Sequence, residues 1–343
     1  MARCVRVPKQ EGERARADLL SKGMLDTSRR IGSDGQFLLI PVLAEGCGGY
    51  EAADADLEPV ERAPTDYRDV ADVPEGVRGE LPTSFDVVGD VAIIKLPDAL
   101  LPYKRRIGEA MMSVSRSVRA VMLDSGVKGE MRVRDLEQIA GEGGPETVHR
   151  EFGVRMAIDP SKVYFNPRLA TERARVASLV RDGETVIDMF AGAAPFGLVI
   201  CRMARPEVVY SIDINPEAEG FARRSMALNR IGNIVPITGD APAAMEGLPP
   251  ADRVIMNLPQ TAESFLPAAL MGAKDGGTVH LYKVAERSEF DGFMERMRYN
   301  ARSLGFVISI EGVTELKTYS PTMSVYAIDI KRETRLTSSE DRA

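Results

Sequence analysis

The sequence predicts an α/β fold in which helices alternate with the strands of a mostly parallel sheet. Two observations favour this class: short apolar segments recur between residues 184 and 259, and each of them ends in a polar or glycine-containing loop. The segments cover residues 184–187, 208–213, 234–237 and 254–256. In open α/β sheets the carboxyl ends of the strands share one edge, and ligands bind in the crevice beside it. We therefore expect a binding site at this edge.

The loop after the first segment reads Asp188-Met189-Phe190-Ala191-Gly192 and leads into a helical pattern. Gly192 allows the backbone to approach a ligand closely, and the N-terminus of the following helix offers free N–H groups. The full glycine fingerprint of a dinucleotide site is missing, so for this loop taken alone a purely structural turn is the favoured interpretation.

Carboxylates follow the second and third segments. Asp213 lies 25 residues after Asp188, where an acid can accept hydrogen bonds from both hydroxyls of a ribose. Asp240 follows the third segment, and Asn257-Leu258-Pro259 forms the fourth loop. Each acid taken alone also fits a cap at a strand end, but the series fits a nucleoside without a pyrophosphate. S-adenosylmethionine is such a ligand, and the pattern resembles the class I methyltransferases.

The last part of the chain has the element order that this class implies. Two apolar segments, 306–313 and 323–330, follow a helical pattern and are expected to pair antiparallel. This arrangement matches the Rossmann-like, seven-stranded sheet of the class I methyltransferases. We assign residues 163–332 to this domain and residues 333–343 to a polar tail.

Three regions precede this domain. Residues 1–43 have the pattern of a small α/β module, and residues 44–80 are acidic and rich in Gly, Ala and Pro, which is typical of a linker. Residues 81–162 are expected to form an α+β domain. Within it we expect a strand pair around a Gly-Asp turn, a helix over 100–123, and an extended segment over 130–134.

Charge is unevenly distributed along the 343 residues, whose net charge is −7. Residues 51–100 hold 4 Lys and Arg against 13 Asp and Glu, whereas residues 101–182 hold 15 against 11. The basic surplus permits phosphate contacts but is equally compatible with solvated helix surfaces. Without an apolar run of about 18 residues or a signal peptide, we expect a cytoplasmic protein with no membrane partner. The three cysteines are scattered, so no metal site is expected: Cys4, Cys47 and Cys201.

A helix start is predicted at Asn166-Pro167-Arg168, where Asn166 is the N-cap and Pro167 takes the first helical position. Glu172 lies four residues after Arg168 and three before Arg175. From this spacing alone, a surface ladder of ion pairs is the favoured interpretation of Glu172.

The motifs Asn166-Pro167-Arg168-Leu169, Glu172-Arg173 and Asn257-Leu258-Pro259 occur in an order that resembles the archaeal and eukaryotic tRNA (guanine-37, N1)-methyltransferase family. The N-terminal module resembles the tRNA-elbow-binding domain of that family, and residues 85–90 resemble its second-domain signature. The resemblance implies methyl transfer from S-adenosylmethionine to N1 of guanosine 37. It also implies a tRNA partner, bound at the anticodon loop and the elbow, and a monomeric enzyme.

The resemblance also implies roles for individual residues. Glu172 would be the general base that removes the N1 proton, and Arg132 would stabilise negative charge on O6, with Arg134 as the alternative. Asn257 would orient the base or the cofactor. The guanine pocket would include Tyr164, Arg168 and Pro259. The cofactor would be held by Arg173, Asp188, Phe190, Gly192, Asp213, Ile214, Asp240, Ala241 and Asn257.

Two other functions stay open at this point. A wyosine-pathway aminocarboxypropyl transferase uses the same cofactor on a similar fold, and a non-catalytic tRNA-binding protein would keep only the scaffold. The intact Pro167-Arg168-Leu169 and Asn257-Leu258-Pro259 loops disfavour the aminocarboxypropyl transferase, and the plausible cofactor residues at all four strand ends disfavour the non-catalytic protein. Gln260 follows this loop where enzymes that methylate exocyclic amines often carry an aromatic residue, which favours a ring-nitrogen target.

Overall fold

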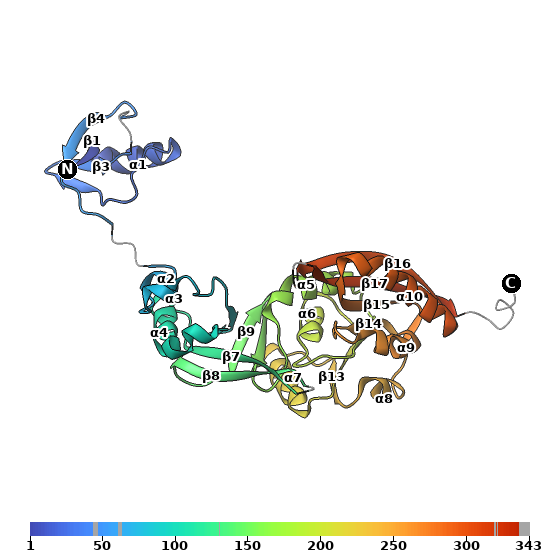
Figure 1. Ribbon diagram of the computed structural model, residues 1–343. Coiled ribbons are helices and arrows are strands. Elements are labelled where there is room, and N and C mark those ends of the chain that lie inside the picture. Colours follow the sequence, from blue (N-terminus) through green and yellow to red (C-terminus); the bar gives the residue numbers. More distant parts are fainter. Residues whose placement is uncertain (44–46, 61–63, 130, 319, 321, 336–343) are drawn as a thin grey trace. The chain divides into compact units, whose positions relative to one another are not determined.

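The computed structural model describes residues 1–343 except 44–46, 61–63, 130, 319, 321 and 336–343. The chain divides into two compact units, Met1–Thr65 and Asp66–Ala343, whose elements are labelled in Figure 1. None of the described helices is long and apolar enough to cross a lipid bilayer.

The first unit is an antiparallel sheet in the order β2-β3-β1-β4, covered by one helix. Its strands are β1 (Ala2–Pro8), β2 (Gly32–Asp34), β3 (Phe37–Pro41) and β4 (Glu51–Ala55), and helix α1 spans Gly12–Ser21 after the 3-10 turn η1 (Lys9–Glu11). Leu19 of α1 packs with Val5 and Ile40 in the core of this unit.

The boundary that we expected at residue 43 is wrong, because β4 lies within the predicted linker and pairs with β1. The composition of β4 is misleading: its acids face outward, while Ala53 and Ala55 pack with Cys4 and Leu57 in a second small core. The part of the linker after residue 65 is also ordered and belongs to the next unit.

The second unit begins with an α+β layer built on the sheet β5-β6-β7-β8. These strands span Asp86–Val88, Val91–Ile94, Ala120–Lys128 and Val133–Gly141, and the helices are α2 (Tyr67–Val70), α3 (Glu75–Arg78), η2 (Asp98–Tyr103) and α4 (Lys104–Val114). Because Tyr67 and Leu81 pack with Ile107 of α4, this layer starts well before the predicted residue 81. The strand pair around Gly89 is confirmed.

The helix expected over 100–123 is only partly correct. Its α-helical part ends at Val114, and Val121 lies in strand β7. Val118 and Val121 face the same core as Ile107 although they lie outside the helix. A turn containing Ser115 and Ser117 separates the helix from the strand.

Strands β9 (Thr147–Glu151) and β10 (Val154–Ile158) form an antiparallel hairpin. The hairpin packs on the layer that follows it in the chain, because the backbone N–H of Ala157 donates to Ser225 of α7 (Pro216–Asn229) at 2.9 Å. Met156 and Val154 share a core cluster with Phe196 of α6. The predicted domain boundary at residue 162 therefore lies too late in the chain, because the β9–β10 hairpin already belongs to the next layer.

The largest sheet has seven strands in the order β13-β12-β11-β14-β15-β17-β16, with β17 antiparallel to both of its neighbours. The predicted seven-stranded sheet is thus confirmed. Its strands are β11 (Thr185–Asp188), β12 (Val208–Asp213), β13 (Ile234–Thr238), β14 (Ala251–Met256), β15 (Ala273–Glu286), β16 (Phe306–Thr318) and β17 (Met323–Arg335). The predicted tail therefore starts inside β17, and its last eight residues lie outside the described part.

Helices cover both faces of this sheet, as Figure 1 shows. Neighbouring strand residues alternate between two cores, so that Val186 and Tyr282 lie in one while Ile187 and Leu281 lie in the other. The first core is closed by α5 (Ala170–Leu179), α6 (Pro195–Met203) and α7 (Pro216–Asn229). The second is closed by α8 (Ala241–Met245), α9 (Ala262–Gly272) and α10 (Phe290–Ser303), which follows the short turn η4 (Arg287–Glu289).

We predict that a chain lacking residues 1–65 retains a cooperative thermal transition within a few degrees of that of the full chain. The reason is that the apolar cores on the two sides of residue 65 are separate. A chain lacking only residues 1–43 would instead leave β4 without its partner β1. Circular dichroism melting of both variants is the measurement. A non-cooperative melt of the variant that lacks residues 1–65 would contradict the prediction.

Candidate active site

The glycine loop after β11 is held by the carboxylate at the end of β12. The N–H of Gly192 donates to Asp213 Oδ2 at 2.6 Å, and the N–H of Asn215 donates to Oδ1 at 2.9 Å. Gly192 has a φ of +53°, and a Cβ at this position would lie 2.8 Å from the carbonyl oxygen of Tyr164. Only glycine therefore fits here, and the loop brings Asp213 and the backbone of Tyr164 to the same place.

Asp188, at the end of β11, is buried and incompletely hydrogen-bonded. Its Oδ1 accepts from the N–H of Phe190 at 3.4 Å, while Oδ2 has no hydrogen-bond partner among the described residues. Burial, reinforced by the charge of Asp213, raises the pKa of Asp188 to about 7. Burial also raises the pKa of Asp213. A ligand with hydroxyl, amino or ammonium donors would satisfy the free oxygen.

The other predicted cofactor residues lie at the same edge of the sheet. Phe190 packs edge-on against Phe265, and Ile214 is 54% exposed just after β12. Asp240 follows β13 and caps α8, accepting from the N–H of Ala243 at 3.3 Å. Ala241, the first residue of α8, is buried. One contact of Asp240 is therefore a cap, as the alternative interpretation of this acid expected.

Arg173 lies in the core, with 1% of its surface exposed. Its guanidinium binds both oxygens of Glu151 at 2.5 and 2.7 Å and donates to the carbonyl of Asn166 at 3.1 Å. Although burial opposes ionisation, hydrogen bonds from His149 and Arg173 hold the pKa of Glu151 below its usual range. Arg173 thus fastens the Asn166 turn to the β9–β10 hairpin.

The Asn166 turn has the predicted capping geometry. The side chain of Asn166 accepts from the N–H of Arg168 at 3.0 Å, and Pro167 takes the first position of the short turn η3 (Pro167–Leu169) that leads into α5. Arg168 donates to Asp86 of β5 at 2.8 Å. The α+β layer is therefore bound directly to this turn.

A hollow of about 200 Å³ lies between the Asn166 turn and the α+β layer. It brings together several of the predicted substrate residues, and Tyr164 is 38% exposed, which disfavours a packing role for its ring. Asp86 accepts from both Arg134, at 2.7 Å, and Arg168. The lining includes Tyr164, Arg168, Arg132, Arg134, Asp86 and Asp124.

The extended segment expected over residues 130–134 is only partly correct, and Glu130 lies outside the described residues. Arg132 lies in the turn between β7 and β8 with a φ of +53°, because the chain reverses here, and only Arg134 belongs to β8. Arg134 binds Asp86 and Asp124. Arg132 instead donates to the side chain of Gln260, in the loop after β14.

The loop after β14 is also tied to β15, because the carbonyl of Pro259 accepts from the N–H of Val284 at 2.9 Å. Among the described residues the Asn257 amide makes no side-chain hydrogen bond. The loop is therefore fixed through Pro259 and Gln260, while the amide of Asn257 keeps its donors and acceptor for a ligand.

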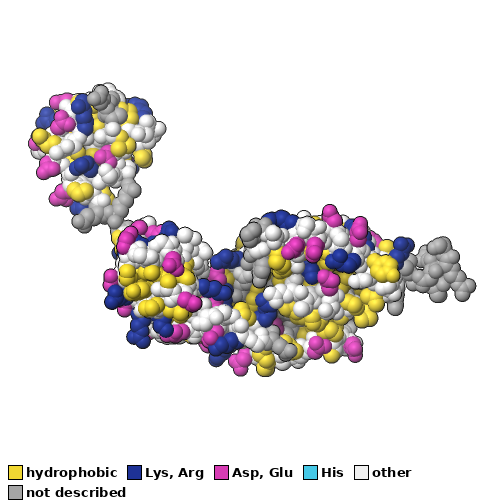
Figure 2. Space-filling model, in the orientation of Figure 1, with side chains coloured by type: hydrophobic (Ala, Val, Ile, Leu, Met, Phe, Trp, Pro, Cys, Tyr) yellow, Lys and Arg dark blue, Asp and Glu magenta, His cyan; other side chains and the backbone are white. Residues whose placement is uncertain are grey.

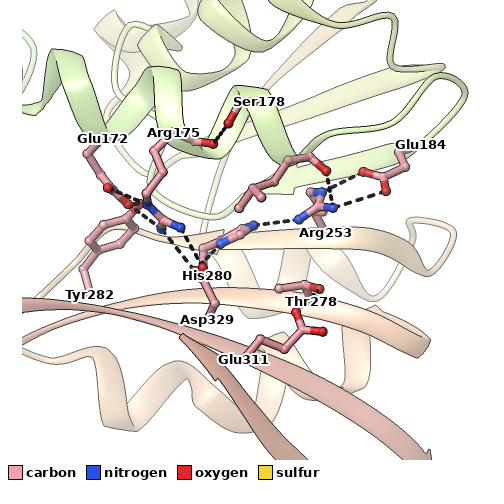
Figure 3. A network of polar contacts seen from close by, with 11 residues as sticks. Glu172, Arg175, Ser178, Glu184, Arg253, Thr278, His280, Tyr282, Glu311 and Asp329 are labelled. Atoms are coloured by element: carbon pink, nitrogen blue, oxygen red, sulfur yellow. Dashed lines mark hydrogen bonds and ion pairs between the residues drawn. The ribbon is translucent and has the colours of Figure 1, made fainter. Parts of the chain in front are cut away.

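Glu172 occupies the first turn of α5 and is 4% exposed. Its Oε1 accepts from the Tyr282 hydroxyl and from Arg175, both at 2.7 Å, and its Oε2 accepts from Arg175 at 2.8 Å (Figure 3). The expected pairing with Arg175 is present, but a surface ladder is wrong because Glu172 is buried and Arg168 binds Asp86. Tyr282 follows Leu281, the partner of the last residue of β14, so Glu172 lies at the carboxyl edge.

Several residues that shape this site were absent from the sequence prediction. Asp86 lies inside the quoted signature of residues 85–90, so that motif was the available signal. For the others no local signal exists, because their partners are 22 to 154 residues away along the chain. They are Glu151, Tyr282 and Asp329, together with Gln260, which was noted in the sequence only as a non-aromatic residue.

Comparison with known proteins identifies the family. Family models match the TRM5/TYW2 methyltransferase domain over residues 147–309, the TYW2 N-terminal domain over 70–144 and the tRNA methyltransferase 5 N-terminal domain over 4–48. Over 333 residues the chain is 42% identical to tRNA (guanine(37)-N(1))-methyltransferase Trm5b of Pyrococcus abyssi, covering 96% of this chain and 99% of that protein. The chain belongs to the tRNA (guanine(37)-N(1))-methyltransferase family.

Solved structures agree with this assignment to the family. The crystal structure of Trm5b from Pyrococcus abyssi has a TM-score of 0.86 at 41% identity, covering 97% of this chain and 100% of that one. A complex of aTrm5 with tRNALeu has a TM-score of 0.77 at 30% identity, covering 96% and 99%. Pyrococcus horikoshii TYW2 in complex with MeSAdo has a TM-score of 0.66 at 26% identity, covering 78% and 98%. The predicted fold and family are thus confirmed.

We predict that Asp188→Asn changes how the free energy of unfolding depends on pH in the absence of cofactor. The native pKa of Asp188, about 7, exceeds its ordinary value of 3.8, so the native state binds an extra proton between these values. The wild type should therefore lose stability relative to the variant as pH rises from about 4 to 7, by at most on the order of 4 kcal/mol. Urea unfolding of both proteins at several pH values measures this difference, and parallel curves would contradict it.

Proposed function

We infer that this protein transfers the methyl group of S-adenosylmethionine to N1 of guanosine 37 in tRNA. The observation that carries this proposal is the 42% identity to Trm5b over nearly the whole of both chains. The aminocarboxypropyltransferase of Methanocaldococcus jannaschii is a more distant relative, 28% identical over 73% of this chain and 98% of its own length. The methyltransferase is therefore the better supported of the two enzymes.

The residues at the carboxyl edge fit the cofactor. S-adenosylmethionine combines ribose hydroxyls, an adenine and an ammonium group, and when bound it supplies an electrophilic methyl group. We propose that Asp213 receives the ribose hydroxyls and that the partnerless oxygen of Asp188 accepts from a donor of the ligand. Gly192 leaves room for this approach, and Phe190, Ile214 and Ala241 would supply the apolar walls.

Guanine N1 carries a proton, so it becomes a nucleophile only when that proton is removed. We propose Glu172 as the general base. Its Oε2 accepts a single hydrogen bond among the described residues, which leaves a lone pair for the N1 proton. Arg132, held by Gln260 beside the Asn257 loop, would stabilise the charge that grows on O6. Asn257 would orient the base, and Tyr164, Arg168 and Pro259 would shape its pocket.

The partner of this site would be tRNA, as in the solved complex of aTrm5 with tRNALeu. We propose that the anticodon loop reaches the carboxyl edge and that residues 1–65 bind the elbow, in a monomeric, cytoplasmic enzyme. Figure 2 shows Lys and Arg side chains interspersed with Asp and Glu on the visible face. Local placement of cations would therefore matter more for binding than the net charge of the chain.

We predict that tRNA with guanosine at position 37 accepts a methyl group from labelled S-adenosylmethionine, whereas the same tRNA with adenosine 37 does not. Only guanine offers an N1–H whose removal leaves charge on O6. Nucleoside mass spectrometry should find 1-methylguanosine. A larger aminocarboxypropyl increment, or no product at all, would overturn the proposed reaction.

We predict that Glu172→Gln keeps the affinity for S-adenosylmethionine but lowers the rate of methyl transfer by about 10²-fold or more, because the amide cannot accept the N1 proton. Calorimetry measures the affinity, and single-turnover kinetics measure the rate. Glu75→Gln is the matched control, since it removes the acid of an exposed Glu–Arg pair with the same spacing. An unchanged rate in the Glu172 variant would reduce Glu172 to a structural role.

A further inference from the structure

Arg175 bridges two buried carboxylates from different elements. Besides Glu172, its guanidinium binds Asp329 of β17 at 2.6 and 3.1 Å. Glu172 and Asp329 are 4% and 9% exposed. In such surroundings each carboxylate needs hydrogen bonds or a counter-charge. The guanidinium of Arg175 is therefore the counter-charge of two carboxylates.

Behind Asp329 the polar contacts continue across the sheet (Figure 3). His280 pairs with Asp329 in the strand register, and its Nδ1 lies 2.7 Å from Asp329 Oδ1. Its Nε2 lies 3.2 Å from Arg253, which in turn binds Glu184 at 2.7 Å. Because arginine can only donate, Nε2 must accept and Nδ1 must donate to Asp329.

The charges of this network do not balance. Within the described part of the chain it contains the carboxylates of Glu172, Asp329 and Glu184 but only the guanidiniums of Arg175 and Arg253. Uptake of one proton would make it neutral, which suits a base in a buried setting. Although burial opposes ionisation, hydrogen bonds from His280 and Arg175 hold the pKa of Asp329 well below its usual range. The proton would therefore not be taken by Asp329.

Tyr282 completes the surroundings of Glu172. Its hydroxyl is buried and donates to Oε1, and burial raises the pKa of Tyr282 well above its ordinary value, so it stays a donor. Arg175 also donates to Oε1, whereas Oε2 receives one bond from Arg175. The two oxygens are thus unequal, and Oε2 is the one with unused accepting capacity.

We propose that Asp329 and Tyr282 are positioning residues for the general base Glu172. Asp329 holds Arg175 and keeps it paired when Glu172 becomes neutral, and Tyr282 occupies Oε1 so that the proton goes to Oε2. In the step they support, the N1–H bond breaks and an O–H bond forms at Glu172. The electron pair left on N1 would form the bond to the methyl carbon as the bond from that carbon to the sulfonium sulfur breaks. The electron pair of the broken bond would stay on the sulfur of the departing thioether, and the proton would later pass to solvent. This inference rests on the proposed function of Glu172.

The test uses Tyr282→Phe, which removes only the hydroxyl, and Asp329→Asn, which removes only the charge. At saturating cofactor and tRNA, each should lower the single-turnover methylation rate by about 10-fold or more. The KM for tRNA and the affinity for S-adenosylmethionine should stay within about twofold of the wild type. Matched controls are Tyr326→Phe, in the other core, and Asp252→Asn, near the start of β14. Both controls should keep the wild-type rate.

Double variants with Glu172→Gln separate positioning from general damage to the fold. If both residues act through Glu172, adding Tyr282→Phe or Asp329→Asn to Glu172→Gln should slow the reaction little further. Additive losses, or wild-type rates in both single variants, would overturn the inference. If Asp329→Asn does not fold, the inference is tested by comparing Tyr282→Phe, Glu172→Gln and their double variant.

The same measurements distinguish this inference from the proposed function. A wild type that makes no 1-methylguanosine would refute the reaction itself. A wild type that makes it, together with a Glu172→Gln variant of normal rate, would refute the role of the base and the inference with it. If the Glu172→Gln variant is slow while the Tyr282→Phe and Asp329→Asn variants keep the wild-type rate, only this inference is refuted and the proposed function stands.

Discussion

The placement of helix α5 depends on the buried Arg173 and the half-buried Arg175, which lie on either side of one alanine. Arg173 binds Glu151 in the β9–β10 hairpin, and Arg175 binds Asp329 in the sheet. A buried guanidinium without its carboxylate would be strongly destabilising, so each pair fixes the helix against one neighbouring layer. Glu172 precedes both arginines in the first turn, and the Asn166 turn lies just before it. The position of the proposed base is therefore set by ion pairs formed with two other parts of the chain.

The α+β layer contributes to the same place through its acids. Asp86 binds Arg134 within its own layer and Arg168 in the turn before α5. Asp90 accepts from Thr147 in the hairpin at 2.7 Å and binds Arg119. Both acids of the motif at residues 85–90 thus join layers that are distant in sequence. The motif that suggested a domain signature is, in physical terms, a set of interlayer contacts.

The sequence predicted what depends on local pattern. The strands that end at the carboxyl edge followed from apolar segments with polar ends, and the capping of the Asn166 turn followed from Asn166 and Pro167. The seven-stranded sheet followed from the resemblance to the class I methyltransferases. Failures occurred where local pattern is ambiguous: β4 is built from alanines and acids, and Val118 and Val121 keep a helical spacing although one lies in a turn and the other in a strand. The contacts of Glu172 could not be predicted, because Tyr282 and Asp329 approach it only after three strands have paired.

The Asp188 carboxyl group is buried beside a second acid, and one of its oxygens has no hydrogen-bond partner in the described part of the chain. That arrangement weakens the native state, and a bound ligand that donates to the oxygen removes part of the penalty. Protein molecules that have the ligand bound then unfold less often and are cleaved less readily by proteases. Scarcity of the methyl donor would consequently reduce the amount of this protein in the cell as well as its turnover.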